Sequence, residues 1–452
     1  MAKTLTEKLC KNDWKYALTR WFWAKPHFKR YFRHIHVIGK ENIPSKGPLI
    51  YAGNHQNALM DAMAIVCTQK HQTVFVARAD IFKKPLIIKI LHFFRILPIY
   101  RKRDGGSSYD NYDNNQETFE IVDKLLRAGM VHGIMPEGAF NPYKRLNTLQ
   151  KGIFRTALKA QEAYGDTGGV QIVPIGLNWQ NPRKFFKDVT IIYGKPIAVA
   201  EYFALYQENP AKAYLKMQET LVEELRKLMI DIHSETHYTT IENIRETFGY
   251  DYAKAIQCDP DHPKERLEAE QELVKKIDHI AETNEPKMQA LEQTFSQYQS
   301  GLKKLNIRSR LLQYSKIPWY ELLEDFGVLI LGFPFAVIGA ILGFLPLSLA
   351  KKYEKMIKDP QFLSSTQYVV AMVVRSLQNF ILIIILVLTC YNKIILLAFF
   401  LALILYAERL MLFYVEHYKR TMGKWRYFRL SRQNDALLNE LKKQREKMLS
   451  EL

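Results

Sequence analysis

Short apolar runs alternate with amphipathic stretches over the first two hundred residues of the chain. Runs typical of buried strands occur at residues 34–38, 47–53, 74–77, 96–101, 131–135, 170–177 and 189–193. Helical spacing of apolar residues lies between them, at 58–68, 81–94, 117–128 and 154–163. A loop rich in Gly, Asn and Asp is expected at 103–115. This alternation predicts an α/β domain at 35–204, with a mostly parallel sheet flanked by helices.

The N-terminal stretch, residues 1–34, is basic and aromatic and lacks the long apolar core of a signal peptide. Helices of this composition often lie in a membrane interface, with aromatic side chains inward and cations toward the headgroups. An ordinary helix packed on the domain is an equally good interpretation. The lysine-studded apolar helix at 81–94 is a second candidate for the interface.

Residues 205–318 have a helical pattern. An apolar stripe at three-four spacing begins at Met288, and an earlier one runs from Leu267 to Ala281. Residues 283–286 separate the two stripes, which predicts an antiparallel helical hairpin. Whether this hairpin projects as an arm or packs on the domain stays open, and packing is the default.

The character of the chain changes in its last third. Residues 326–350 carry no charge, and residues 380–407 are apolar apart from a polar interruption at 391–393. Runs of this length predict a membrane region, which we assign to 319–416. A basic polar helix is expected at 417–452.

Lys and Arg flank both apolar runs, so the positive-inside rule predicts that the chain returns to one side after each. Gly and Pro within 326–350 favour a re-entrant hairpin there. The second run is expected to turn at 391–393, giving helices at 370–390 and 394–415 in which Arg375 and Glu408 can pair. The alternative is one tilted span over 380–407 with Lys393 at the membrane midplane.

The chain carries 64 Lys and Arg against 46 Asp and Glu, a net charge of +18. This excess favours an anionic membrane, an anionic substrate or nucleic acid as a partner. No zinc finger or RNA-binding signature is present, so we expect no nucleic-acid partner. The four cysteines are far apart and show no metal-ligand spacing, so we expect a reducing compartment and no metal.

The candidate chemistry lies where the strand at 47–53 ends. His55 follows the strand, and Asp61 lies six residues later near the start of the helix at 58–68, for which Asn54 or Asn57 is a candidate N-cap. A carboxylate can hold an imidazole in one tautomer while the other ring nitrogen takes a proton from an alcohol. His71 and His132 are interpreted as structural or surface residues.

Four sequence blocks fall in this domain in a fixed order: NHQNALMD from Asn54, ILPIYR ending at Arg101, MPEG at Glu137 and Gly138, and VPIGLNW around Pro174. In order and spacing they resemble the phospholipid and glycerol acyltransferase family, and the Lys151-Gly152 pair adds to the resemblance. The resemblance implies that His55 is the general base and Asp61 its partner. It also implies that Arg101, Glu137, Gly138 and Lys151 bind the acceptor substrate and that Pro174 lines the acyl-donor side.

Two departures from the family pattern stand out. Five residues separate His55 from Asp61, where most members have four, and one extra residue turns a helical side chain by about 100°. The pair therefore needs a bulge or an irregular first turn. A subgroup resembling the fungal glycerol-3-phosphate acyltransferases has this longer spacing and an apolar C-terminal tail. In the third block, Ala139-Phe140 replaces the usual Thr-Arg, so Lys144, Arg145 or Lys151 is expected to supply the missing cation.

By this resemblance the chain is expected to be a membrane-bound acyltransferase of phospholipid biosynthesis, with its catalytic domain on the cytoplasmic side. It would transfer a fatty acyl chain from acyl-coenzyme A or acyl carrier protein, without a further cofactor, to glycerol 3-phosphate or lysophosphatidate. Another lysophospholipid acceptor, and an inactive membrane scaffold with the same fold, are the alternatives. Acyl-chain length and oligomeric state stay open.

Overall fold

The computed structural model describes residues 2–100, 108–357, 359–390 and 392–452, so Arg101 lies outside the described residues. Two compact units divide the chain. The first comprises Met1–Asp231 together with Asp359–Ser365, and the second comprises Ile232–Lys358 and Thr366–Leu452. Each unit is described by itself below.

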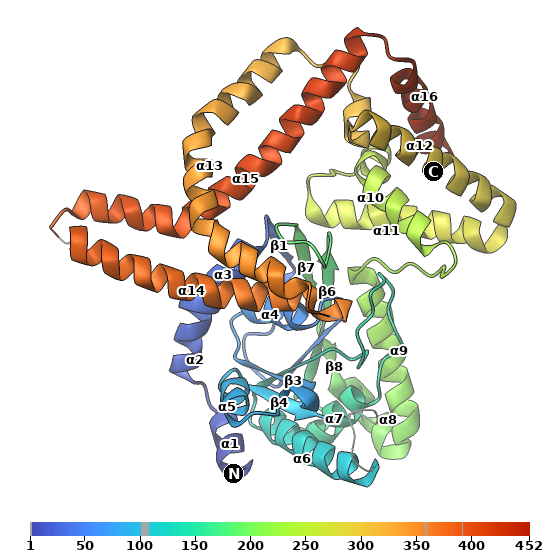
Figure 1. Ribbon diagram of the computed structural model, residues 1–452. Coiled ribbons are helices and arrows are strands. Elements are labelled where there is room, and N and C mark those ends of the chain that lie inside the picture. The colour runs from blue at the N-terminus through green and yellow to red at the C-terminus, as the bar shows by residue number, and fades with distance from the viewer. Residues whose placement is uncertain (1, 101–107, 358, 391) are drawn as a thin grey trace. The chain divides into compact units, whose positions relative to one another are not determined.

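The first unit is built on one eight-stranded sheet, as predicted (Figure 1). Its order is β1-β7-β6-β2-β5-β3-β4, with the short β8 paired to β6. All pairings are parallel except those of β6 with β7 and with β8. The strands are β1 Ile35–Ile38, β2 Leu49–Gly53, β3 Thr73–Arg78, β4 Ile96–Ile99, β5 Val131–Ile134, β6 Gln171–Trp179, β7 Val189–Tyr193 and β8 Ile197–Ala198.

Helices cover both faces of the sheet, so its central strand β2 is buried along its whole length. Ile50 and Ala52 point into a core shared with Leu125, Phe154 and Leu221, which lie on three different helices. Tyr51 is buried on the opposite face. The helices of this unit are α1 Ala2–Leu9, α2 Trp14–Thr19, α3 Lys25–Tyr31, α4 Leu59–Thr68, α5 Pro85–Phe93, α6 Ser108–Arg127, α7 Gly152–Gln161, α8 Phe203–Glu208 and α9 Pro210–Leu228.

Helix α6 begins at Ser108, inside the stretch predicted as a loop, so that prediction was wrong for residues 108–115. The polar sequence there forms the first turns of a helix whose later turns are buried through Val122 and Leu125. Asn115 on this helix also accepts from the Tyr100 N–H at 2.8 Å and donates to its carbonyl at 2.7 Å. Burial of the later turns and the two Asn115–Tyr100 hydrogen bonds stabilise this helix by more than the weak helix propensity of Asn and Asp destabilises it.

The second unit contains the predicted helical hairpin, in which α11 (Pro263–Thr283) and α12 (Glu285–Leu305) meet at Asn284. Phe248 of α10 (Tyr238–Ala255) stacks on Tyr298 of α12, with the ring centroids 5.6 Å apart. The C-terminal helix α16 (Ala436–Glu451) packs Leu441 against Gly301. The hairpin therefore packs within a helical cluster.

Three helices of this unit are long and apolar enough to cross a membrane: α13 (Trp319–Glu354), α14 (Leu363–Cys390) and α15 (Ile394–Arg432). Helix α14 ends at Cys390 and α15 begins at Ile394, so residues 380–407 are not one helix and the single tilted span was wrong; Tyr391 itself lies outside the described residues. Arg375 and Glu408 form the expected ion pair, with both side chains buried.

The predicted re-entrant hairpin within 326–350 was wrong, because α13 is one continuous helix of 36 residues. Its glycines pack against α15 instead of breaking the helix. Gly339 lies against Ala407 and Met411, and Gly343 against Glu408. Small residues at this spacing let two helix backbones approach closely, and membrane helices tolerate internal proline.

Candidate active site

His55 and Asp61 meet at the carboxyl edge of the sheet. Strand β2 ends at Gly53, His55 follows in the connecting loop, and Asp61 lies in the first turn of α4. The imidazole Nδ1 is 2.9 Å from Asp61 Oδ2. The aspartate side chain is fully buried, whereas the histidine side chain is 22% exposed. With Nδ1–H donating to the carboxylate, Nε2 is left to accept a proton from a substrate hydroxyl.

Three further N–H groups hold the Asp61 carboxylate. The backbone amides of Gln56 and Asn57 donate to Oδ2 at 3.0 and 2.7 Å. The indole Nε1–H of Trp179 donates to Oδ1 at 2.9 Å. A buried carboxylate needs such donors, since an unpaired buried charge is strongly destabilising. Together they fix the orientation of the carboxylate and, through it, of the imidazole.

The extra residue between His55 and Asp61 is accommodated at Ala58, as the predicted irregular first turn requires. Ala58 has φ 41° and ψ −119°, a backbone conformation that L-residues rarely adopt, and α4 begins directly after it. The irregular turn predicted from the longer spacing therefore lies at Ala58, between His55 and Asp61.

The prediction that Asn54 or Asn57 caps α4 was wrong. The N-cap residue is Ala58, whose side chain makes no capping hydrogen bond. Asn54 instead joins the loop to β6, accepting from Leu177 N–H at 2.7 Å and donating to the Leu177 carbonyl at 3.2 Å. Asn57 bonds Ser364 through its side chain. Longer-range partners therefore take both asparagine side chains away from the helix end.

Glu137 lies beneath the His55 loop and is 2% exposed. Its two carboxylate oxygens accept from the backbone amides of His55, at 2.7 Å, and Asn147, at 2.9 Å. Burial raises the pKa of Glu137 to about 7, although these two N–H bonds lower it. With both oxygens bonded to the backbone, Glu137 joins the first and third sequence blocks and positions His55.

Gly138 and Lys151 lie in adjacent parts of one loop. Gly138 has φ +66°, and a Cβ there would meet the Gln150 side chain at 2.8 Å. The Gln150 amide donates to the Pro136 carbonyl at 2.7 Å, which ties the turn to the start of α7. Lys151 is exposed at that start, beside a shallow hollow that Arg155 also lines. Gly138 therefore lies in the turn that carries Glu137, and Lys151 lies at the start of α7, to which that turn is hydrogen-bonded.

Pro174 is buried within the sheet, opposite Ala52 of β2. Its carbonyl accepts from the Gly194 amide at 2.8 Å, and its ring contacts the same glycine. The structure therefore places Pro174 in the framework under the His55 loop. Lys144, a candidate for the missing cation, donates to the Trp179 carbonyl at 2.8 Å.

His132 and His71 have structural surroundings, as expected. His132 is buried, its Nδ1 lies 2.9 Å from the Val74 carbonyl, and burial lowers its pKa to about 4. His71 Nδ1 lies 2.7 Å from the Tyr51 hydroxyl. Among the described residues, no group of three or more His, Cys, Asp or Glu has the arrangement of a metal site.

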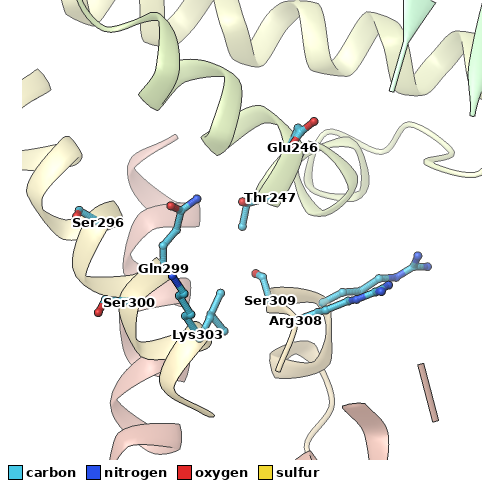
Figure 2. Close-up of a pocket in the computed structure, with 10 residues that line it drawn as sticks. Glu246, Thr247, Ser296, Gln299, Ser300, Lys303, Arg308 and Ser309 are labelled. Carbon is cyan, nitrogen blue, oxygen red and sulfur yellow. The ribbon is translucent and has the colours of Figure 1, made fainter. Parts of the chain in front are cut away.

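A second hollow lies in the helical cluster of the other unit (Figure 2). Its lining includes the cations Lys303, Arg308 and Arg310, the carboxylate of Glu246, and the neutral polar residues Thr247, Ser296, Gln299, Ser300 and Ser309. It holds none of the candidate catalytic or substrate-binding residues predicted from the sequence.

The His55–Asp61 pair thus has the geometry that general-base activation of a hydroxyl requires. Residues 34–178 match the family model described as Acyltransferase. This match supports, for residues 34–178, the resemblance to the phospholipid and glycerol acyltransferase family that the four sequence blocks carry.

Two curated relatives are similar to this region. The chain is 22% identical over 188 residues to glycerol-3-phosphate O-acyltransferase 1 of Saccharomyces cerevisiae, covering 41% of this chain and 24% of that protein. It is 28% identical over 197 residues to 1-acyl-sn-glycerol-3-phosphate acyltransferase of Borreliella burgdorferi, covering 44% of this chain and 69% of that protein. The chain thus spans about a quarter of the yeast relative.

Among solved structures, the 1-acyl-sn-glycerophosphate acyltransferase of Thermotoga maritima is similar at 19% identity and a TM-score of 0.33. The similarity covers 49% of this chain and 80% of that chain.

Proposed function

We propose that this protein is a membrane-bound acyltransferase that transfers a fatty acyl chain from a thioester donor to a glycerol phosphate acceptor. The observation that carries the proposal is the His55–Asp61 pair, with Nδ1 2.9 Å from a fully buried carboxylate. Acyl-coenzyme A or acyl carrier protein is the proposed donor. Glycerol 3-phosphate and lysophosphatidate are the proposed acceptors, since the relatives are named for these two substrates.

The chemistry follows from the free Nε2 of His55. This nitrogen takes the proton of the acceptor hydroxyl as the oxygen attacks the thioester carbonyl carbon, forming a tetrahedral intermediate. The intermediate collapses as the C–S bond breaks, and the imidazolium returns the proton to the departing thiolate. The products are an ester and a free thiol, so no cofactor is consumed. Asp61 stabilises the imidazolium between these two steps.

An acceptor phosphate calls for cations near His55, because Arg and Lys bind phosphate through charge-assisted hydrogen bonds. Lys144 donates to the Trp179 carbonyl, and the Trp179 indole donates to Asp61. Lys144 is therefore connected to the His55–Asp61 pair through one residue. We propose that Lys144 binds the phosphate together with Arg101. Replacing either should raise the KM of the acceptor far more than that of the donor.

Membrane association is supported by the three apolar helices and by an exposed apolar surface on the first unit. This surface combines the N-terminal helices with α5, which meet where the rings of Trp23 and Phe94 stack 6.2 Å apart. Its exposed side chains include Trp14, Trp21, Phe22, Leu86 and Ile90. An apolar surface of this kind, interspersed with lysines, suits the headgroup region of a bilayer.

The connections of α13 support a single-sided arrangement. The segment that follows α13, Asp359–Ser365, belongs to the same compact unit as residues 1–231. In the described part of the chain, no helix between 232 and 318 is long and apolar enough to cross a membrane. We therefore propose that both ends of α13 lie on the side of the acyltransferase domain, that α13 does not cross, and that α14 and α15 enter and return as a hairpin. The basic flanks assign that side to the cytoplasm.

Cysteine labelling tests this arrangement. In sealed vesicles of a variant with its native cysteines replaced, Lys316→Cys and Lys355→Cys flank α13. Both should react with an impermeant maleimide from the same side as a cysteine in the acyltransferase domain. Reaction of the two positions from opposite sides would show that α13 crosses.

Activity is tested by offering the purified full chain labelled acyl donor and each acceptor in turn, and identifying the products. Acylation of glycerol 3-phosphate or lysophosphatidate supports the proposal. Acylation of a different lysophospholipid alone would change the acceptor. No transfer to any acceptor, from a folded protein, would favour an inactive scaffold with this fold.

A further inference from the structure

The link between the two apolar helices α13 and α14 is part of the acyltransferase unit. Residues Asp359–Ser365 cluster with Met1–Asp231, although the chain on both sides of them belongs to the other unit. The link contains a short 3-10 turn, Pro360–Phe362, and the first residues of α14. Its place in the first unit comes from specific contacts with the end of α4 that carries Asp61.

Two consecutive serines of the link make these contacts. The Leu59 amide, the first N–H of α4, donates to Ser365 Oγ at 3.2 Å. Ser364 Oγ–H donates to the side-chain oxygen of Asn57. Asn57, Ser364 and Ser365 are all buried. Two residues before Ser364, the ring of Phe362 lies under the Arg78 guanidinium, whose central carbon is 5.4 Å from the ring centroid.

These contacts replace a cap that α4 lacks. The first N–H groups of a helix have no partner within the helix, and a polar side chain at the N-cap usually accepts from one of them. Here the N-cap residue is Ala58, which has no polar side chain and an unusual backbone conformation. Ser365 supplies the acceptor from more than three hundred residues further along the chain.

The same contacts reach the catalytic pair through one residue. Asn57 is held by Ser364 through its side chain, and its backbone amide donates to Asp61 Oδ2 at 2.7 Å. Asp61 Oδ2 also bonds His55 Nδ1. A shift of the link would therefore move Asn57 and the first turn of α4, and with them the carboxylate that orients the imidazole.

We propose that Ser364 and Ser365 are positioning residues for the His55–Asp61 pair, so that acyl transfer depends on the seating of the link between α13 and α14. The proposal rests on the function proposed above. It ties the chemistry to the link that joins the two apolar helices, because a displaced link would leave the pair in place but change its orientation.

The kinetic test uses the full chain in vesicles. Ser365→Ala and Ser364→Ala should each lower kcat about tenfold, because small misplacements of catalytic groups carry large rate penalties. The KM of both substrates should stay within about twofold, since neither serine contacts substrate. Ser365→Thr keeps the hydroxyl acceptor and should restore kcat. Ser376→Ala is the matched control, as its hydroxyl donates to Met372 within α14.

A double-mutant cycle tests whether Ser364 acts on Asp61 through Asn57. Asn57→Ala combined with Ser364→Ala should lower kcat no further than Asn57→Ala alone, because the two residues act through one bond. Multiplicative losses would contradict that path. Wild-type kcat in Ser365→Ala, or the same loss in Ser376→Ala, would overturn the proposal.

Hydrogen exchange keeps the proposal testable even if the protein transfers no acyl group. Amides in the peptide covering 56–66 should exchange about tenfold faster in Ser365→Ala than in the wild type or in Ser376→Ala. Unchanged exchange would overturn the role of the link whatever the activity. If the wild-type chain transfers no acyl group but Ser365→Ala still exchanges faster than the wild type, the role of the link stands and only the proposed function fails.

Discussion

The indole of Trp179 donates its Nε1–H to the Asp61 carboxylate at 2.9 Å, from the last residue of β6 to the first turn of α4. This bond joins the fourth sequence block to the first, 118 residues apart. It occupies Oδ1 and leaves Oδ2 to His55 and the two loop amides. The carboxylate is thereby fixed on both oxygens, which is what a partner for a general base requires.

Trp179→Phe should lower kcat about tenfold with little change in the KM of either substrate. Phenylalanine keeps the aromatic packing on Phe32, whose ring centroid lies 5.4 Å away, and removes only the donor. A lost hydrogen bond to a charged group is worth about 1.5–3 kcal/mol. Steady-state kinetics measure the effect, and Trp319→Phe, at an exposed position, is the control. A rate equal to that of the control would contradict the role of the indole.

Ala58→Gly should stabilise the protein and leave activity near the wild-type level. The φ of 41° at this position strains a residue with a Cβ, and such strain is worth about 1–3 kcal/mol. Ala58→Val should be destabilising, because a β-branched side chain fits this conformation worse. Thermal unfolding in detergent measures both variants. A lower Tm for Ala58→Gly would contradict the strain inferred at Ala58.

Glu137→Gln should change how stability depends on pH. Burial gives Glu137 a pKa of about 7 against an ordinary 4.5, so the folded state binds the extra proton between these values. Wild-type stability therefore falls, relative to the variant, as pH rises from 4.5 to 7. The pKa difference corresponds to at most about 3 kcal/mol. Tm values of both proteins at pH 5 and pH 8 test the sign, and a gap that moves the other way would refute it.

A lower kcat is also expected for Glu137→Gln at pH 8. Both Glu137 oxygens accept from backbone N–H groups, but a glutamine side chain has one oxygen and one NH₂ group. The NH₂ group would face one of these backbone donors, and the lost hydrogen bond would disturb the His55 loop.

The N-terminal aromatic residues should contact lipid. A fluorophore on Phe22→Cys, in chain reconstituted into vesicles, should be quenched by lipids that carry a quencher near the headgroups. Phe22 is 72% exposed, and apolar side chains of this size gain by leaving water. A fluorophore on Lys212→Cys, an exposed position of α9, is the control. Equal quenching at both positions would mean that the exposed aromatics do not meet the membrane.

The sheet and the contact between His55 and Asp61 could be predicted because their signals are local. Apolar runs mark the strands, and β2 leads directly to His55 and Asp61. The N-terminal helix shows why two interpretations were both reasonable: Phe28 and Tyr31 are buried in the domain, whereas Trp21 and Phe22 are exposed. One helical segment there packs on the domain and presents an apolar surface.

Residues that act across long sequence separations could not be predicted in this way. Trp179, Ser364 and Ser365 reach the Asp61 region from 118 residues away or more, and nothing in their own sequence neighbourhoods marks that contact. For Glu137, the resemblance implied substrate binding and gave no sign of the bonds that its oxygens accept from the His55 and Asn147 backbone amides. The continuous helix α13 was missed because glycine and proline were interpreted as breaks, whereas its glycines allow close packing on α15.

The most direct measurement is the rate of acyl transfer to glycerol 3-phosphate and lysophosphatidate by the purified full chain and by His55→Ala, with folding checked by thermal unfolding. No other side chain bonded to Asp61 can accept a proton at neutral pH, since the indole and the amides of Gln56 and Asn57 are donors. The expected result is product from the wild type and a loss of at least about a thousandfold in the folded variant. A folded His55→Ala protein that keeps a rate near the wild-type value would contradict the assignment of His55 as the base.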